Sequence, residues 1–294
     1  MSTIELPKNE DSAAGLGFAV AAYGLWGFLP LYLKLLDHVP AVEVVAHRIL
    51  WSIPIAGLVL LALGRTGDIR AALTTPRTLA MGCVTAALIT VNWGIYVWAI
   101  ANDRALDASL GYYINPLFSV FLGFLLLGER PNRMQGVAIA LAFAAVLVLT
   151  FSAGGIPWVS IGLTVSWGFY AYFKKSLPIG PNQGFLLEVL ILAGPAIAYI
   201  LLVEVEGAGH FASDTWLLLG CGVVTAVPLM LYANGAKRLR LTTIAILQYI
   251  APTMIFLFAV FAFGETFDRA RAIAFPLIWA ALVLYTTSLW RARR

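Results

Sequence analysis

The chain alternates long apolar segments with short polar ones. Ten apolar segments of about 20 residues follow one another from Ala13 to Trp290, and a helix of that length crosses the roughly 30 Å hydrocarbon core of a bilayer. The spans that this pattern predicts are 14–36, 41–63, 78–100, 106–127, 133–152, 156–174, 183–203, 214–236, 242–263 and 270–290. Residues 1–12 are polar, and we expect a disordered cytoplasmic tail there and not a signal peptide. The pattern therefore predicts an all-α integral membrane protein with ten transmembrane helices.

Composition and charge support this interpretation and add an orientation. The chain is 61% hydrophobic and 12% charged, with a mean hydropathy of +0.88, which is outside the range of soluble domains. If the N-terminus is cytoplasmic, most of the 19 Lys and Arg residues fall on the cytoplasmic side, as the positive-inside rule requires. We therefore expect both termini in the cytoplasm. The net charge of +4 then faces anionic lipid, and no nucleic acid partner is expected.

The sequence contains an internal repeat. Residues 136 positions apart match at several of the least apolar positions, namely Tyr96, Tyr113, Pro116 and Glu129 with Tyr232, Tyr249, Pro252 and Glu265. The segment "WGFLPLYLK" at 26–34 also matches "WGFYAYFKK" at 167–175. We predict two five-helix repeats, 13–153 and 154–294, within one integrated transmembrane domain. Because five is odd, the second repeat enters the membrane from the opposite side, which is the arrangement of many secondary transporters.

Two prolines fall near the middle of matching spans. Pro116 in the fourth span and Pro252 in the ninth each predict a helix kink and free the backbone carbonyl four residues earlier, at Tyr112 and Gln248. A freed carbonyl at membrane depth must face protein or a watery cavity. One such kink is readily satisfied by neighbouring helices, but two at matching depth favour a central cavity.

Other polar and aromatic residues extend this candidate cavity. In the third span Asn92 and Tyr96 share one helical face. Two tryptophans, each followed by glycine, indicate either tight helix packing or the apolar walls of a pocket. The residues that we expect to bind substrate are Trp26, Asn92, Tyr96, Tyr112, Asn115, Trp167, Tyr232, Asn234, Gln248 and Tyr249. This lining suits a small amphipathic solute, zwitterionic or aromatic, because an inorganic ion would require more charge.

Ionisable residues at membrane depth are candidates for function. One hypothesis is a pair of gates, with Lys34 and Glu43 closing the outside and Lys175 and Glu188 closing the inside. Snorkelling of the lysines to lipid head groups is the alternative. His47 and Glu43 are also candidates for proton coupling, since histidine titrates near neutral pH.

Two further charged patterns have a structural interpretation. Glu129 with Arg133, and Glu265 with Arg269, are i, i+4 pairs that we expect to clasp the turns after the kinked helices. The chain has no HExxH, GxSxG or Walker motif, so no enzyme activity, metal or cofactor is predicted. The segment "NDRALD" at 102–107 is similar to part of a prenyltransferase motif but lacks a second acidic motif. An intramembrane enzyme or a channel remains a minor alternative.

The blocks "NWGIYVWAIANDRALDASLGYYINPLFSVFLGFLLLGER" and "LQYIAPTMIFLFAVFAFGE" resemble the RarD-type permeases of the EamA group in the drug/metabolite transporter superfamily. The resemblance implies two inverted five-helix repeats in a bacterial inner membrane and the transport of small metabolites. We therefore expect a secondary transporter that works by alternating access, as an exporter or facilitator of amino-acid-like or aromatic solutes. The alternative is a broad-specificity exporter of chloramphenicol-like drugs. The substrate, the direction, the coupling ion and the oligomeric state stay open.

Overall fold

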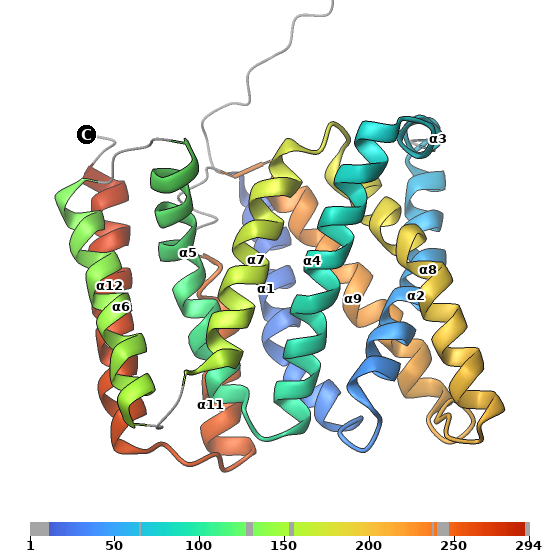
Figure 1. The fold of residues 1–294 in the computed structure, drawn as a ribbon. Coiled ribbons are helices and arrows are strands. Elements are labelled where there is room, and N and C mark those ends of the chain that lie inside the picture. The colour runs from blue at the N-terminus through green and yellow to red at the C-terminus, as the bar shows by residue number, and fades with distance from the viewer. Residues whose placement is uncertain are drawn as a thin grey trace, which may run out of the picture.

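The computed structural model describes residues 12–64, 66–127, 132–152, 156–236, 238–239 and 247–291, and every regular element in these ranges is a helix. The helices form a bundle, shown in Figure 1. Their bounds are α1 Ala13–Lys34, α2 Ala41–Ala62, α3 Gly67–Thr74, α4 Pro76–Ala101, α5 Ala105–Leu127, α6 Arg133–Ser152, α7 Trp158–Ser176, α8 Pro181–Val205, α9 Thr215–Ala236, α11 Ile250–Leu257, the π-helical η1 Phe258–Ala262 and α12 Arg269–Arg291.

Each predicted span coincides with a helix to within a few residues over the described ranges, which confirms the all-α membrane fold. Among the described residues, seven helices are long and apolar enough to cross a bilayer: α1, α2, α4, α6, α8, α9 and α12. The count of ten crossings stays a prediction. The short helix α3 was not predicted, because it lies in the polar connection between α2 and α4.

The helices pack in pairs that repeat between the two halves of the chain. Helix α1 packs against α9 as α7 packs against α4, and α5 packs against α7 as α11 packs against α1. Helix α2 packs against α8, and α6 packs against α12 at one side of the bundle (Figure 1). Helix α1 begins and α12 ends at the same end of the bundle, at the top of Figure 1. These pairs are the ones that two inverted repeats would produce.

Two equivalent glycines support this interpretation. A Cβ atom on Gly27 of α1 would overlap the side chain of Met254 on α11, and one on Gly168 of α7 would overlap the ring of Phe118 on α5. Met254 and Phe118 are 136 positions apart, the spacing of the sequence repeat. Both crossings therefore use a glycine to bring helices close together. The boundary between the repeats at 153/154 stays a prediction.

The two proline-containing helices differ in regularity. Helix α5 runs without interruption through Pro116. Turn residues Gln248 and Tyr249 precede α11, one turn before Pro252, where the proline removes a backbone hydrogen bond. Helix α11 then continues into the wider π-helical turn η1. A break next to Pro252 is thus present, and a kink at Pro116 stays a prediction.

Candidate functional site

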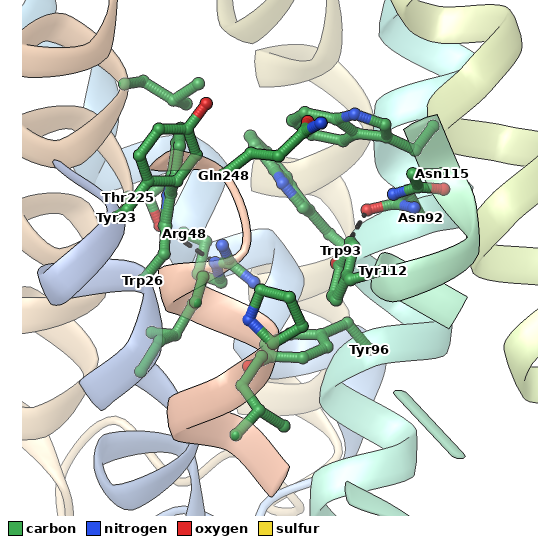
Figure 2. Close-up of a pocket in the computed structure, with 16 residues that line it drawn as sticks. Tyr23, Trp26, Arg48, Asn92, Trp93, Tyr96, Tyr112, Asn115, Thr225 and Gln248 are labelled. Atoms are coloured by element: carbon green, nitrogen blue, oxygen red, sulfur yellow. Dashed lines mark hydrogen bonds between the residues drawn. The ribbon is translucent and has the colours of Figure 1, made fainter. Parts of the chain in front are cut away.

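A cavity of about 100 Å³ lies in the core of the bundle (Figure 2). Helices α1, α2, α4, α5, α7 and α9 contribute side chains to its wall, together with the segment from residue 248 into α11. The lining residues are Tyr23, Trp26, Leu29, Arg48, Asn92, Trp93, Tyr96, Tyr112, Asn115, Trp167, Thr225, Leu229, Gln248, Ala251, Pro252 and Ile255. The wall is therefore mostly aromatic and aliphatic, with a few polar groups. This composition is typical of small-molecule sites.

Most of the residues expected to bind substrate meet at this cavity. Seven of the ten line it: Trp26, Asn92, Tyr96, Tyr112, Asn115, Trp167 and Gln248. They come from five segments that are far apart in the sequence, which the repeat and the helical periodicity together anticipated. Their role as substrate contacts stays a prediction.

The other three expected residues lie behind or away from the wall. The ring of Tyr232 packs against Trp26, with centroids 5.6 Å apart. The amide of Asn234 donates a hydrogen bond to a carbonyl of its own helix, one turn earlier. The ring of Tyr249 stacks on Tyr113, with centroids 6.4 Å apart. Residues two apart on a helix point in different directions, so Tyr232 and Asn234 do not share one face.

Asn92 is occupied by contacts within the protein. Its Nδ2 donates to the carbonyl of Leu163 at 3.1 Å and to the hydroxyl of Ser166 at 3.0 Å, both on α7. Its Oδ1 accepts a hydrogen bond from the hydroxyl of Tyr112 on α5 at 3.3 Å. Asn92 therefore ties α4, α5 and α7 together and fixes the ring of Tyr112 in the cavity wall.

Arg48 also lines the cavity and was not among the residues expected to bind substrate. The residue is only 3% exposed, and its guanidinium lies over the ring of Trp93, 4.8 Å from the centroid. Its Nε donates to the hydroxyl of Thr225 at 2.9 Å, and its Nη1 has no hydrogen-bond partner among the described residues. Figure 2 shows the guanidinium between these two neighbours. The sequence does contain a signal for Arg48, since an arginine within an apolar span is a candidate for function.

Arg48 changes the electrostatics expected of the cavity. No Asp or Glu is among the residues that line it, so the wall carries one formal positive charge. The expected lining of indoles, phenols and amides did not include this charge, because the sequence of the second span does not show which neighbours surround Arg48. The cavity can pair with an anionic group of a solute.

The outer gate pairs differently from the prediction. Lys34 binds Asp103 at 2.6 Å and Asp37 at 3.5 Å, and not Glu43. The role of Lys34 and Glu43 as an outer gate stays a prediction. The turn between α4 and α5 brings Asp103 to the end of α1. Glu43 is fully buried, and its carboxylate accepts the backbone N–H of His210 at 2.8 Å and lies 2.8 Å from the Nδ1 of the same residue. It therefore joins α2 to the connection between α8 and α9.

His47 lies beside this contact. Its ring stacks on Phe211 with centroids 5.4 Å apart, and its Nδ1 accepts a hydrogen bond from the indole of Trp51 at 3.1 Å. The residue is buried and faces the same connection as Glu43. Its role in proton coupling stays a prediction.

At the other end of the bundle, Glu188 forms a buried ion pair. Its carboxylate lies 2.5 Å from the Nζ of Lys174, and it accepts a hydrogen bond from the hydroxyl of Tyr170 at 3.2 Å. Glu188 is 1% exposed. The side chain of Lys175, the expected partner, lies outside the described residues. The neighbouring lysine thus supplies the charge that the prediction assigned to Lys175.

Glu265 caps a helix. Its carboxylate accepts hydrogen bonds from the first backbone amides of α5, that of Ala105 at 2.6 Å and that of Leu106 at 3.0 Å. These bonds replace the expected pair with Arg269. Burial raises the pKa of Glu265 above its usual value, and the two amides oppose that shift. The matching residue Glu129 lies outside the described residues.

Comparison with known proteins identifies the family. The EamA-like transporter family matches this chain twice, over residues 13–151 and 154–287. A relative from Streptomyces exfoliatus, named Protein RarD, is 42% identical over 98% of this chain and 93% of its own. An uncharacterized transporter from Vibrio cholerae is 40% identical over 95% of this chain and 94% of its own. A crystal structure described only as that of a protein shares the fold, with a TM-score of 0.63 and 21% identity over 97% of this chain and 100% of that one. The chain therefore belongs to the EamA-like transporter family and is a multi-pass membrane transporter of the drug/metabolite transporter superfamily.

Proposed function

We propose that the protein is a secondary transporter that moves amino-acid-like or aromatic solutes across a bacterial inner membrane by alternating access. It acts as an exporter or a facilitator. The observation that carries this proposal is the central cavity, which is lined from both halves of the chain. Sites at the interface between inverted repeats are where many secondary transporters bind substrate.

The size of the cavity supports a moving site. Its volume of about 100 Å³ is below the roughly 300–1,000 Å³ of typical ligand pockets. A solute of amino-acid size therefore enters only if helices move apart. We propose that α5 and α11, with α4 and α9, rock between two arrangements that expose the cavity to opposite sides.

Buried carboxylates near opposite ends of the bundle support a gate at each end. Glu43 binds the connection between α8 and α9 through His210, and Glu188 binds α7 through Lys174. Each contact joins two segments that must separate if the cavity is to open at that end. We propose that Glu43 and His47 also provide the route for a coupled proton.

The alternative, a broad-specificity drug exporter, is favoured by the three tryptophans in the wall, Trp26, Trp93 and Trp167. Asn115→Ala and Gln248→Ala discriminate between the two functions. A selective site should lose at least tenfold in uptake rate, because a hydrogen bond to a solute is lost, whereas a promiscuous aromatic pocket should tolerate both changes.

The function is tested by uptake of labelled solutes into proteoliposomes that contain the purified protein. The panel holds amino acids and chloramphenicol, each with and without a pH gradient. Saturable uptake of amino-acid-like solutes is expected, and stimulation by the gradient would support coupling through His47 and Glu43. Uptake of chloramphenicol alone would favour the alternative, and no uptake across the panel would contradict the proposed solutes.

The proposed orientation places both termini in the cytoplasm. A fluorescent protein fused after the last residue should fold and fluoresce, whereas alkaline phosphatase fused there should be inactive. The same two reporters placed after residue 209, in the connection between α8 and α9, should give the opposite result. Equal reporter activity at both positions would contradict the orientation.

A further inference from the structure

We propose that Arg48 is the anion-binding centre of the cavity and that the transported solutes are aromatic carboxylates, recognised by their carboxylate and not by an ammonium group. This inference rests on the proposed function and names its substrate class. It goes beyond the amino-acid-like solutes, because it makes the amino group unnecessary.

The charge of Arg48 is isolated within the bundle. Arg48 lies seven residues after the start of α2, about 10 Å along the helix at 1.5 Å per residue, and is 3% exposed. A charged side chain at membrane depth is unfavourable unless it is paired. Over the part of the chain that the structure describes, no carboxylate forms an ion pair with Arg48. An arriving anion would supply the missing partner.

The N–H donors of Arg48 are held in an orientation that suits a carboxylate. A guanidinium has five N–H groups in one plane and matches a carboxylate with two parallel hydrogen bonds. Thr225 engages Nε, and Trp93 supports the face of the plane, so the orientation of the group is fixed. Nη1 is buried and has no partner among the described residues, and the same holds for the hydroxyl of Tyr96, which also lines the cavity. Two buried donors that have no partner among the described residues thus belong to side chains that line the same cavity.

The remainder of the cavity wall suits an aromatic solute. The indoles of Trp26, Trp93 and Trp167 form apolar walls that suit an aromatic ring. An ammonium group would meet the positive charge of Arg48, and no Asp or Glu lines the cavity to compensate it. A carboxylate without an amino group therefore fits this wall better than an amine without a carboxylate.

A purely structural role for Arg48 makes a different prediction. The contacts with Trp93 and Thr225 would then suffice, and substitution would weaken every solute equally or only lower stability. An anion-binding role weakens carboxylates alone. The charge of the probe therefore separates the two roles.

The test uses four probes that share a phenyl ring: 3-phenylpropanoate, 3-phenylpropanamide, phenethylamine and phenylalanine. Binding to the detergent-solubilised protein is measured by calorimetry, and uptake is measured in proteoliposomes. In the wild type we expect 3-phenylpropanoate to bind at least as tightly as phenylalanine and roughly ten- to hundredfold more tightly than the amide or the amine, because hydrogen bonds to charged groups are the strong ones.

Two variants and a matched control complete the test. Arg48→Gln should remove the preference for 3-phenylpropanoate over the amide, and Arg48→Lys should retain part of it, since lysine keeps the charge but not the planar donors. Arg77→Gln removes an exposed arginine outside the cavity and should leave the preference unchanged. If Arg48→Gln does not fold, the affinities of the wild type for the four probes still test whether the cavity prefers a carboxylate.

The outcomes separate the two proposals. Equal affinity for the carboxylate, the amide and the amine, or no binding of any probe, overturns the anion-binding role. Uptake of all probes without preference overturns it too, while the transporter function stands. Selective binding of the carboxylate that depends on Arg48, but without uptake, supports the anion site and contradicts the proposed transport.

Discussion

Buried charged residues in this protein differ in whether they have a partner of opposite charge. Glu188 and Lys174 neutralise each other at 2.5 Å, and Tyr170 adds a hydrogen bond to the carboxylate. Arg48 has no acidic partner among the described residues and faces the cavity. A paired charge at such depth holds helices together, whereas an unpaired one is suited to a ligand.

The ion pair leads to a prediction about stability. Glu188→Ala should lower the free energy of unfolding by about 3–5 kcal/mol, because it leaves the charge of Lys174 buried without a partner. The double variant Lys174→Met with Glu188→Leu should recover most of that loss. Thermal unfolding in detergent measures both. If the losses measured for Lys174→Met alone and Glu188→Leu alone add up to the loss of the double variant, the two residues are not coupled.

Sequence reasoning located residues of the site better than it located their partners. Asn92 and Tyr112 were placed at the cavity because periodicity and the repeat define which helix face points inward. Arg48 was missed because distance along the helix does not reveal which neighbours cover a residue. The contact of Lys34 with Asp103 was not predicted, because Asp103 comes from a turn 69 positions away. Such pairings depend on tertiary packing, which the spacing of residues does not contain.

At the scale of the elements, the contact between α2 and α9 depends on one glycine. A Cβ atom on Gly222 would overlap the backbone carbonyl of Trp51, which cannot rotate away. An added Cβ atom on Gly162 of α7 would overlap only the end of the flexible Ile95 side chain instead. The two glycines therefore differ in how much their surroundings can adjust.

We predict that Gly222→Ala lowers the free energy of unfolding by about 1–3 kcal/mol or more, because overpacking usually has an effect of this size. Gly162→Ala should have a smaller effect, since the end of the Ile95 side chain can move. Gly94→Ala is the control, because nothing lies within 4 Å of the added atom. Thermal unfolding of the three variants in detergent ranks their stabilities. Equal losses of stability for Gly222→Ala and Gly94→Ala would contradict the role of Gly222 in this contact.

The cap on α5 makes a prediction about pH. Burial raises the pKa of Glu265 above that of an unfolded glutamate, so the folded state binds a proton more readily than the unfolded state. The contribution of this group to stability is therefore fully present below the unfolded pKa near 4.5 and is lost as pH rises through the folded pKa. Arg271 and Asp107 are the charged neighbours that influence this pKa.

Glu265→Gln removes this titration and supplies the control. Lowering the pH from 7 towards 4.5 should stabilise the wild type relative to Glu265→Gln, as measured by the difference in melting temperature at each pH. Glu265→Ala should be less stable than Glu265→Gln by about 1 kcal/mol, because it leaves both amides of α5 without their acceptor. A melting difference that stays constant with pH would show that the carboxylate does not titrate in this window.

The helices themselves were predicted well because membrane thickness sets their length. The irregular turn at Gln248 and Tyr249 and the π-helical η1 were not predicted in detail. Pro252 indicated a break nearby, but Pro116 has the same sequence context and α5 continues through it. Whether a proline interrupts a helix depends on what the neighbouring helices offer to its freed carbonyl.

At the scale of the whole molecule, the connection between α8 and α9 is held against α2 at the end of the bundle where α2 begins. Glu43 accepts the backbone N–H of His210 and contacts its ring, and both bonds are protected from water by the full burial of the carboxylate. The neighbouring pair of His38 and Asp214, at 3.2 Å, is largely exposed on the histidine side. Of these two contacts, only that of Glu43 with His210 is buried enough to hold a gate closed, because exposed ion pairs contribute little to stability.

Glu43→Ala should therefore release this connection while the bundle stays folded. We expect hydrogen exchange of a peptide covering residues 206–214 to accelerate roughly tenfold or more, since hydrogen bonds to a charged group contribute about 1.5–3 kcal/mol each. His38→Ala should leave the exchange nearly unchanged. If Glu43 is a gate, Glu43→Ala also changes the rate of solute exchange across proteoliposomes without changing the affinity of the cavity. If Glu43→Ala accelerates hydrogen exchange of this peptide but leaves the rate of solute transport unaltered, Glu43 is an anchor of the connection and not a gate. The opening of the bundle would then be limited by other contacts.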